Sequence, residues 1–109
     1  MGFQFEFENG IREDVLKVIR LMKDERVLLW IPEHLVDYYV CLEAVKENGL
    51  AIRNVPDRFV DDKLIEVALT QNYKAYGFLN EDNKKKYVKF VSKSIVLELM
   101  NATYLKRKY

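Results

Sequence analysis

A segment of about 24 residues recurs along this chain, and a recurrence of that length restricts the folds open to it. Pro32 lies one such step before Pro56. The same step joins further pairs, among them Leu35 and Phe59, Asp37 and Asp61, Ala44 and Ala68, and Asn48 and Asn72. Such a period is typical of repeat proteins, in which each unit buries its apolar face against its neighbours. We therefore expect a stack of similar units. The offset of about 24 residues between equivalent positions is called the repeat step.

Each unit is expected to join a helix to a shorter apolar element. Asp37 is a suitable N-cap because its carboxylate can accept backbone N–H groups, and the helix after it continues to about Asn48. Gly49 is expected to end this helix in the left-handed conformation. Residues 50–55 form the second, short element, and Asp61 begins the cycle again.

The predicted fold is all-α, with three to four stacked short helix pairs. The expected divisions are an extended N-terminal segment 1–10, repeat units 11–36, 37–60 and 61–83, and a degenerate basic terminal unit 84–109. The alternation of aromatic and polar residues over 3–8 is typical of a half-buried strand. In the terminal unit, apolar residues at 87–91 and at 95–100 suggest two helices.

One stretch resembles a known family. The run Ala-Val-Lys-Glu-Asn-Gly-Leu-Ala at 44–51, followed by Val55-Pro56 and then Asp-Asp-Lys at 61–63, is similar to the short helical repeats named DUF4116. The similarity is good over 37–63, fair over 64–80, weak over 12–36 and poor after residue 81. It implies stacked pairs of short helices. It indicates neither a function nor catalytic residues, because the function of that family is unknown.

Composition favours a folded, intracellular protein. Half of the residues are hydrophobic, and the apolar runs are too short to span a membrane. The start of the chain lacks the basic and apolar regions of a secretory signal. A single cysteine, Cys41, forms no internal disulfide, which suits a reducing compartment. We expect a cytoplasmic location and no membrane association.

Enzyme chemistry has little support in the sequence. His34 is the single histidine, so a histidine-pair metal site is excluded. Its place after Pro32 suggests a turn or the surface, and Cys41 lies in an apolar helical pattern typical of a small core residue. A Cys41–His34 dyad would require the two side chains to face each other. We predict no catalytic residue, no metal and no cofactor.

The basic end of the chain is the first candidate binding region. Residues 84–109 carry eight basic residues and one acidic residue, a charge of +7, whereas residues 1–83 carry −6. The basic candidates are Lys84, Lys85, Lys86, Lys89, Lys93, Lys106, Arg107 and Lys108. They could bind an acidic protein partner or nucleic acid. Alternatively, they neutralise the acidic part within the chain or in a head-to-tail oligomer.

Aromatic residues supply the second candidate set. Tyr38, Tyr73 and Tyr76 are predicted partner contacts because exposed aromatic side chains often anchor protein interfaces. The adjacent Tyr38 and Tyr39 point in different directions, so at least one of them lies near the surface. Trp30, in contrast, is expected to cover a junction between units.

The function expected from these features is a small protein-interaction module. It would occupy the surface of a larger partner, as a stoichiometric inhibitor or as an adaptor. The alternative is nucleic-acid binding through the basic terminal unit, although a pI of about 7.8 is low for a dedicated nucleic-acid binder.

Overall fold

The computed structural model describes the backbone of residues 11–108 and the side chains of residues 12–93 and 95. Within these residues every regular element is a helix, which confirms the predicted all-α class. The predicted extended segment 1–10 lies outside the described residues.

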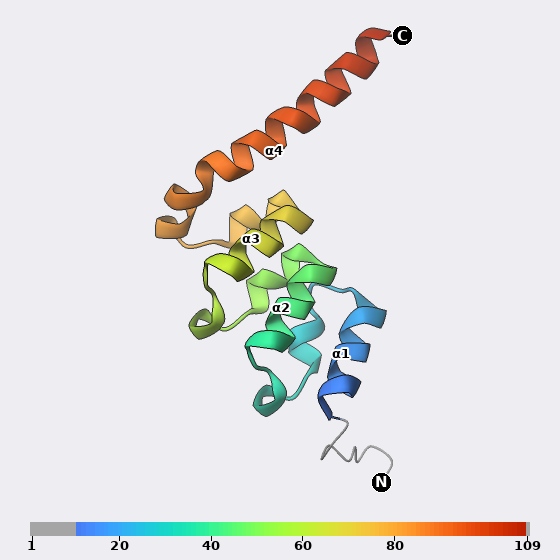
Figure 1. The fold of residues 1–109 in the computed structure, drawn as a ribbon, viewed down its shortest axis with the longest axis vertical. Coiled ribbons are helices and arrows are strands. Elements are labelled where there is room, and N and C mark those ends of the chain that lie inside the picture. The colour runs from blue at the N-terminus through green and yellow to red at the C-terminus, as the bar shows by residue number, and fades with distance from the viewer. Residues whose placement is uncertain (1–10, 109) are drawn as a thin grey trace.

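Helices of two kinds alternate along the chain. In order they are α1 (Ile11–Met22), the 3-10 helices η1 (Val27–Trp30) and η2 (Glu33–Leu35), α2 (Tyr38–Glu47), η3 (Gly49–Asn54), η4 (Asp57–Phe59), α3 (Asp62–Gln71), η5 (Tyr73–Phe78) and α4 (Glu81–Lys108). The helix α2 packs between α1 and α3, and η3 packs between η1 and η5 (Figure 1). The α-helices and the 3-10 helices thus form two adjoining layers.

Side-chain caps begin the two central helices, as predicted. The Asp37 carboxylate accepts the Val40 N–H at 2.9 Å, and the Asp61 carboxylate accepts the Leu64 N–H at 2.9 Å. Both caps have extended backbone, with φ of −125° and −127°. Because such caps satisfy N–H groups that have no partner within the helix, they fix where α2 and α3 begin.

Asparagine side chains begin the 3-10 helices in the same way. Asn48 accepts the N–H of Leu50, and Asn72 accepts the N–H of Lys74, each at 3.0 Å. The backbones of Asn48 and Asn72 are nearly identical, with ψ of 107° and 109°. Two consecutive segments therefore share their local geometry at the repeat step, whereas the number of units in the whole chain stays a prediction.

The core lies between the two layers. Its largest fully buried side chains come from the first three α-helices and from η1: Ile19 on α1, Val27 on η1, Val40, Cys41 and Val45 on α2, and Leu64, Ile65 and Leu69 on α3. Burial of such side chains contributes about 1.5–3 kcal/mol each. These side chains belong to one continuous core cluster that joins successive segments.

The predicted role of Gly49 is wrong. Within the described residues no glycine has a positive φ, and Gly49 begins η3 instead of ending α2 in the left-handed region. Glycine is required at this position for a different reason: a side chain with a Cβ would overlap the carbonyl oxygen of Ala68. The Gly49 N–H also donates to the side-chain oxygen of Gln71. The glycine thus allows η3 to approach the end of α3.

The terminal unit also differs from the prediction. A single helix, α4, replaces the two helices expected over 84–109. It packs against η5 at its beginning and then leaves the stack (Figure 1). Tyr73 stands one repeat step after Gly49, so a large side chain occupies the position where the glycine admits a close neighbour.

Candidate protein-interaction surface

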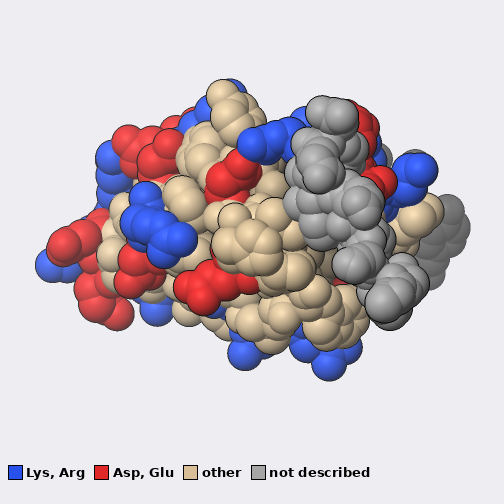
Figure 2. Space-filling view, turned by 90° about the horizontal axis from the view of Figure 1, so that it is seen from below, with Lys and Arg blue, Asp and Glu red and all other residues tan. Residues whose placement is uncertain are grey.

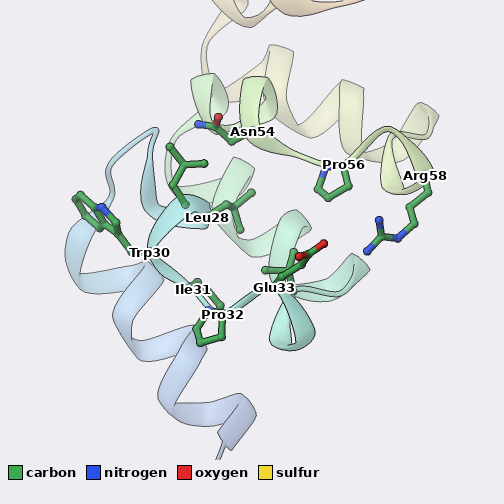
Figure 3. Close-up of a pocket in the computed structure, with 10 residues that line it drawn as sticks. Leu28, Trp30, Ile31, Pro32, Glu33, Asn54, Pro56 and Arg58 are labelled. Atoms are coloured by element: carbon green, nitrogen blue, oxygen red, sulfur yellow. The ribbon is translucent and has the colours of Figure 1, made fainter. Parts of the chain in front are cut away.

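A groove opens between the first two segments of the 3-10 layer. It has a volume of about 490 Å³ and is called the Trp30 groove below. One wall consists of residues 28–33 and Val36, and the other of Asn54, Pro56 and Arg58 (Figure 3). The groove is open along its length, so it suits a ligand that lies across the surface.

The geometry of η1 turns two apolar side chains toward solvent. Leu28 lies within η1 and Ile31 directly follows it with extended backbone, and both are buried. The two residues between them, Leu29 and Trp30, point away from the core and are 64% and 50% exposed. Trp30 is thus half exposed at the boundary between the first two segments, and its expected role in covering a junction stays a prediction.

Polar groups hold and border the walls. The Asn54 side chain donates to the backbone carbonyl of Glu25 at 3.0 Å, which fixes the second wall against the first segment. The Arg26 guanidinium lies 5.9 Å from the centre of the Trp30 ring, within the range of a cation–π contact. Glu33 and Arg58 project from opposite walls (Figure 3). The groove thus joins an apolar floor to a charged rim.

A smaller groove of about 320 Å³ follows in the next segment. Its first wall comes from residues 52–60, one repeat step after that of the Trp30 groove, and its second wall contains Phe78, Leu79 and Asn80. Phe78 is exposed, with the Arg53 guanidinium 5.0 Å from its ring centre. An exposed aromatic ring beside arginine therefore occurs in both grooves.

The α-helical layer presents a third aromatic side chain. Tyr39 is 65% exposed and the Arg12 guanidinium lies 5.7 Å from its ring centre. It borders an open depression lined also by Leu16 and Leu42. The prediction that at least one of the two adjacent tyrosines lies near the surface is confirmed, and the exposed one is Tyr39.

The predicted tyrosine contacts have places within the stack. Tyr38 is half-buried, and its hydroxyl donates to Asp61 Oδ1 at 3.0 Å. Burial and that hydrogen bond raise the pKa of Tyr38. The Tyr76 hydroxyl donates to the Lys84 carbonyl at 2.7 Å and so joins η5 to α4. Tyr73 is also half-buried. Tyr38 and Tyr76 therefore connect neighbouring elements, and contact of any of the three with a partner stays a prediction.

The predicted lysines fall into two groups on α4. Lys86 forms an ion pair with Asp62 at 2.7 Å, and Lys84 lies 3.9 Å from Glu81. Lys85, Lys89 and Lys93 are exposed, and they form no ion pair with a carboxylate of the described residues. The side chains of the remaining candidates lie outside the described residues: Lys106, Arg107 and Lys108.

Charges on the rest of the surface are mixed. Basic and acidic side chains are interspersed on the face seen in Figure 2, with uncharged surface between them. Several ion pairs join neighbouring segments, including Arg20 with Glu43 at 3.3 Å and Arg53 with Glu25 at 3.0 Å. Exposed pairs of this kind contribute little each, about 0–1 kcal/mol.

The two residues considered for catalysis are not placed for it. Cys41 is fully buried, and burial raises the pKa of its thiol to about 12. At neutral pH the thiol is protonated and therefore a poor nucleophile. His34 lies in η2 and is exposed, as predicted for a surface residue. A buried thiol and an exposed imidazole do not make a shared site.

Leu29 and Trp30 were not identified as surface residues from the sequence. They belong to a run of five apolar residues, 27–31, and such a run gives no indication of which side chains face outward. The available signal was the shortness of the element before Pro32, because a 3-10 helix of four residues cannot bury every side chain.

The described residues thus define an all-α protein with open grooves between its 3-10 helices. Residues 37–84 match the family model described as Domain of unknown function (DUF4116), which confirms the resemblance seen in the sequence. No curated protein and no solved structure matches the chain. In the part of the chain that the structure describes, no helix has both the length and the apolar character needed to cross a lipid bilayer.

Proposed function

We propose that this chain is a protein-interaction module that binds the surface of a larger partner through the Trp30 groove. The observation that carries the proposal is the exposure of Leu29 and Trp30 beside that groove. Burying these two side chains in a complex would remove a large apolar area from water, which is the main driving force of association.

The composition of the groove supports a protein ligand. Protein interfaces commonly have an aromatic, apolar centre and a polar rim, and tryptophan and arginine are enriched among the residues that dominate binding. Here Trp30 and Leu29 supply the centre, and Arg26, Glu33 and Arg58 supply the rim. An open groove also leaves a small molecule largely exposed, whereas typical small-ligand pockets enclose most of their ligand.

The proposed mode of action is occupation of the partner's surface. The bound chain would act as a stoichiometric inhibitor, or as an adaptor that presents its second groove or its α4 helix to another molecule. A cytoplasmic location is part of this proposal. Neither role requires chemistry from Cys41 or His34, in keeping with the burial of the first and the exposure of the second.

The test compares partner recovery by two matched double variants. Leu29→Ala with Trp30→Ala removes the apolar side chains at the groove, and Leu21→Ala with Met22→Ala removes two exposed apolar side chains of α1. Tagged forms of both variants and of the wild type are used to capture proteins from native lysate. We expect a partner recovered by the wild type and by the α1 variant, and lost with the groove variant.

Titration calorimetry with the purified partner then gives the size of the effect. We expect the groove variant to lose about 2 kcal/mol or more of binding free energy, which is about thirtyfold in Kd. Equal affinity of the two variants would show that the groove is not the contact surface. Failure of every form to recover a specific partner would contradict the interaction module itself.

A further inference from the structure

The long helix α4 carries three exposed lysines on one side, and they are separate from the Trp30 groove. Lys85, Lys89 and Lys93, called the lysine stripe below, follow at four-residue steps, so each rises about 6 Å above the last along the helix. Tyr87 and Val91 are buried on the side of α4 that faces the stack. Each lysine of the stripe is two residues from one of them, which places it on the opposite side of the helix. The stripe therefore faces away from the stack.

The positive charge of the stripe is not neutralised by the carboxylates that the structure describes near α4. Asp62, on α3, is bound by Lys86 at 2.7 Å and by the Tyr87 hydroxyl at 2.8 Å. Glu81, at the start of α4, lies nearest to Lys84. Asp82, in the first turn of α4, is exposed and forms no ion pair with Lys85, three residues later. Among the described residues, the three lysines of the stripe therefore form no ion pair.

Apolar side chains border the stripe on both sides. Val88 and Phe90 are 46% and 38% exposed. They adjoin Lys89 in the sequence, so each lies about 100° around the helix from it, in opposite directions. A ligand that covers the stripe would therefore meet cationic groups along its centre and apolar groups along its margins.

We infer that the lysine stripe binds an acidic amphipathic helix of a partner protein. Carboxylates four residues apart on such a helix are spaced by about 6 Å, as the lysines are, and apolar side chains beside them would meet Val88 and Phe90. This inference concerns a second surface and does not depend on the Trp30 groove.

The structure favours a protein helix over nucleic acid here. Stacking of bases requires open aromatic faces, but Tyr87 is buried and meets Phe90 edge-on, with ring centres 6.1 Å apart. The stripe contains lysine alone and no arginine, which supplies the bidentate contacts common in nucleic-acid recognition.

The experiment measures binding of a labelled synthetic peptide by fluorescence anisotropy. The peptide is an amphipathic helix with glutamate at four-residue intervals and leucine beside each glutamate. One variant combines Lys85→Glu, Lys89→Glu and Lys93→Glu. Its control combines Lys17→Glu, Lys63→Glu and Lys74→Glu, three exposed lysines elsewhere, so both variants change net charge equally. Circular dichroism verifies that both remain helical.

We expect the stripe variant to bind the peptide at least about tenfold more weakly than the wild type, and the control variant to stay within about twofold. The variant with Leu29→Ala and Trp30→Ala should bind the peptide normally, which separates this result from the test of the Trp30 groove. Equal losses in the two charge-reversal variants, absence of peptide binding, or tighter binding of a labelled oligothymidylate than of the peptide would each overturn the inference.

Discussion

Gly49 and Ala68 lie so close that the carbonyl oxygen of Ala68 occupies the space a Cβ at residue 49 would need. This contact joins η3 to the end of α3 and explains why glycine stands where the next segment has Tyr73. We expect Gly49→Ala to lower the free energy of unfolding by about 1–3 kcal/mol, because backbone has to move to admit the methyl group.

A second glycine provides the control for that prediction. A Cβ added at Gly77 would meet nothing within 4 Å beyond its chain neighbours, and Gly77 has no positive φ. Gly77→Ala should therefore leave stability unchanged or raise it by about 0.4–1 kcal/mol, since alanine reduces the freedom of the unfolded chain. Urea unfolding followed by circular dichroism measures both. Similar effects at residues 49 and 77 would show that close approach is not the reason for Gly49.

Lys23 is expected to yield a stabilising substitution. It follows the last residue of α1 with φ of 48°, in the left-handed region that costs residues with a Cβ about 1–2 kcal/mol. Lys23→Gly should raise the free energy of unfolding by about 1 kcal/mol. The ion pair that it removes, 3.9 Å long and largely exposed, contributes little.

The matched control is a lysine in regular helix. Lys46 is exposed within α2, where glycine is unfavourable by about 1 kcal/mol. Lys46→Gly should therefore lower stability in the same urea titration in which Lys23→Gly raises it. Changes of the same sign would contradict the strain assigned to Lys23.

Asp61, the N-cap of α3, should contribute to stability although its side chain is exposed. Asp61→Ala removes the acceptor for the Leu64 N–H and also for the Tyr38 hydroxyl, so we expect a loss of about 1–2 kcal/mol. Asp61→Asn should retain much of this stability, because asparagine is an equally good N-cap. A thermal melt of both variants provides the measurement, and equal losses would show that the cap does not determine the effect.

Acid should destabilise the protein through Asp37 and Asp62. The hydrogen bonds from Lys86 and Tyr87 hold the pKa of Asp62 below its ordinary value. Partial burial raises the pKa of Asp37, but the Arg12 side chain and the Val40 N–H outweigh it and leave this pKa lowered as well. Both groups bind protons more readily in the unfolded chain. Their contribution is complete above the unfolded pKa of about 4 and is lost as pH falls through the folded values.

Unfolding titrations between about pH 6 and about pH 3 test this dependence across the carboxyl range. Asp62→Asn should reduce the slope of stability against pH on the acid side, because it removes a carboxyl whose pKa is lowered in the folded protein. A slope that Asp62→Asn does not alter would show that its pairing with Lys86 has no energetic effect.

The buried thiol of Cys41 should react slowly. Because burial raises its pKa to about 12 and excludes reagents, we expect modification by a disulfide reagent at about pH 8 to require opening of the fold. The reaction should become immediate in denaturant. Rapid modification of the native protein would show that the segment around α2 opens readily.

The caps and the short elements were predictable because their signals are local. Asp37 and Asp61 each stand directly before an amphipathic helix, and such a carboxylate needs only the next three residues to act as a cap. The role of Gly49 could not be predicted, because it depends on Ala68, a residue that approaches it only after the segments pack. The same reason applies to Trp30, whose exposure depends on how η1 lies against η3.

Non-local packing also determined the terminal region. The apolar residues of α4 are compatible with one helix or two, and no proline or glycine between them marks a break. The two tyrosines Tyr76 and Tyr87 attach this helix to the stack through their hydroxyls, a use that composition alone does not reveal. The basic residues could be identified from the sequence, but not which of them are already paired.

The position of α4 at the end of the stack sets a lower limit on the size of any partner that contacts both the Trp30 groove and the lysine stripe. The Trp30 groove lies near α1, whereas the lysine stripe lies on the first part of α4, at the other end of the stack (Figure 1). A short peptide could reach one of the two sites. A large partner or a long flexible chain could reach both, and its overall affinity would then exceed that of either contact through avidity.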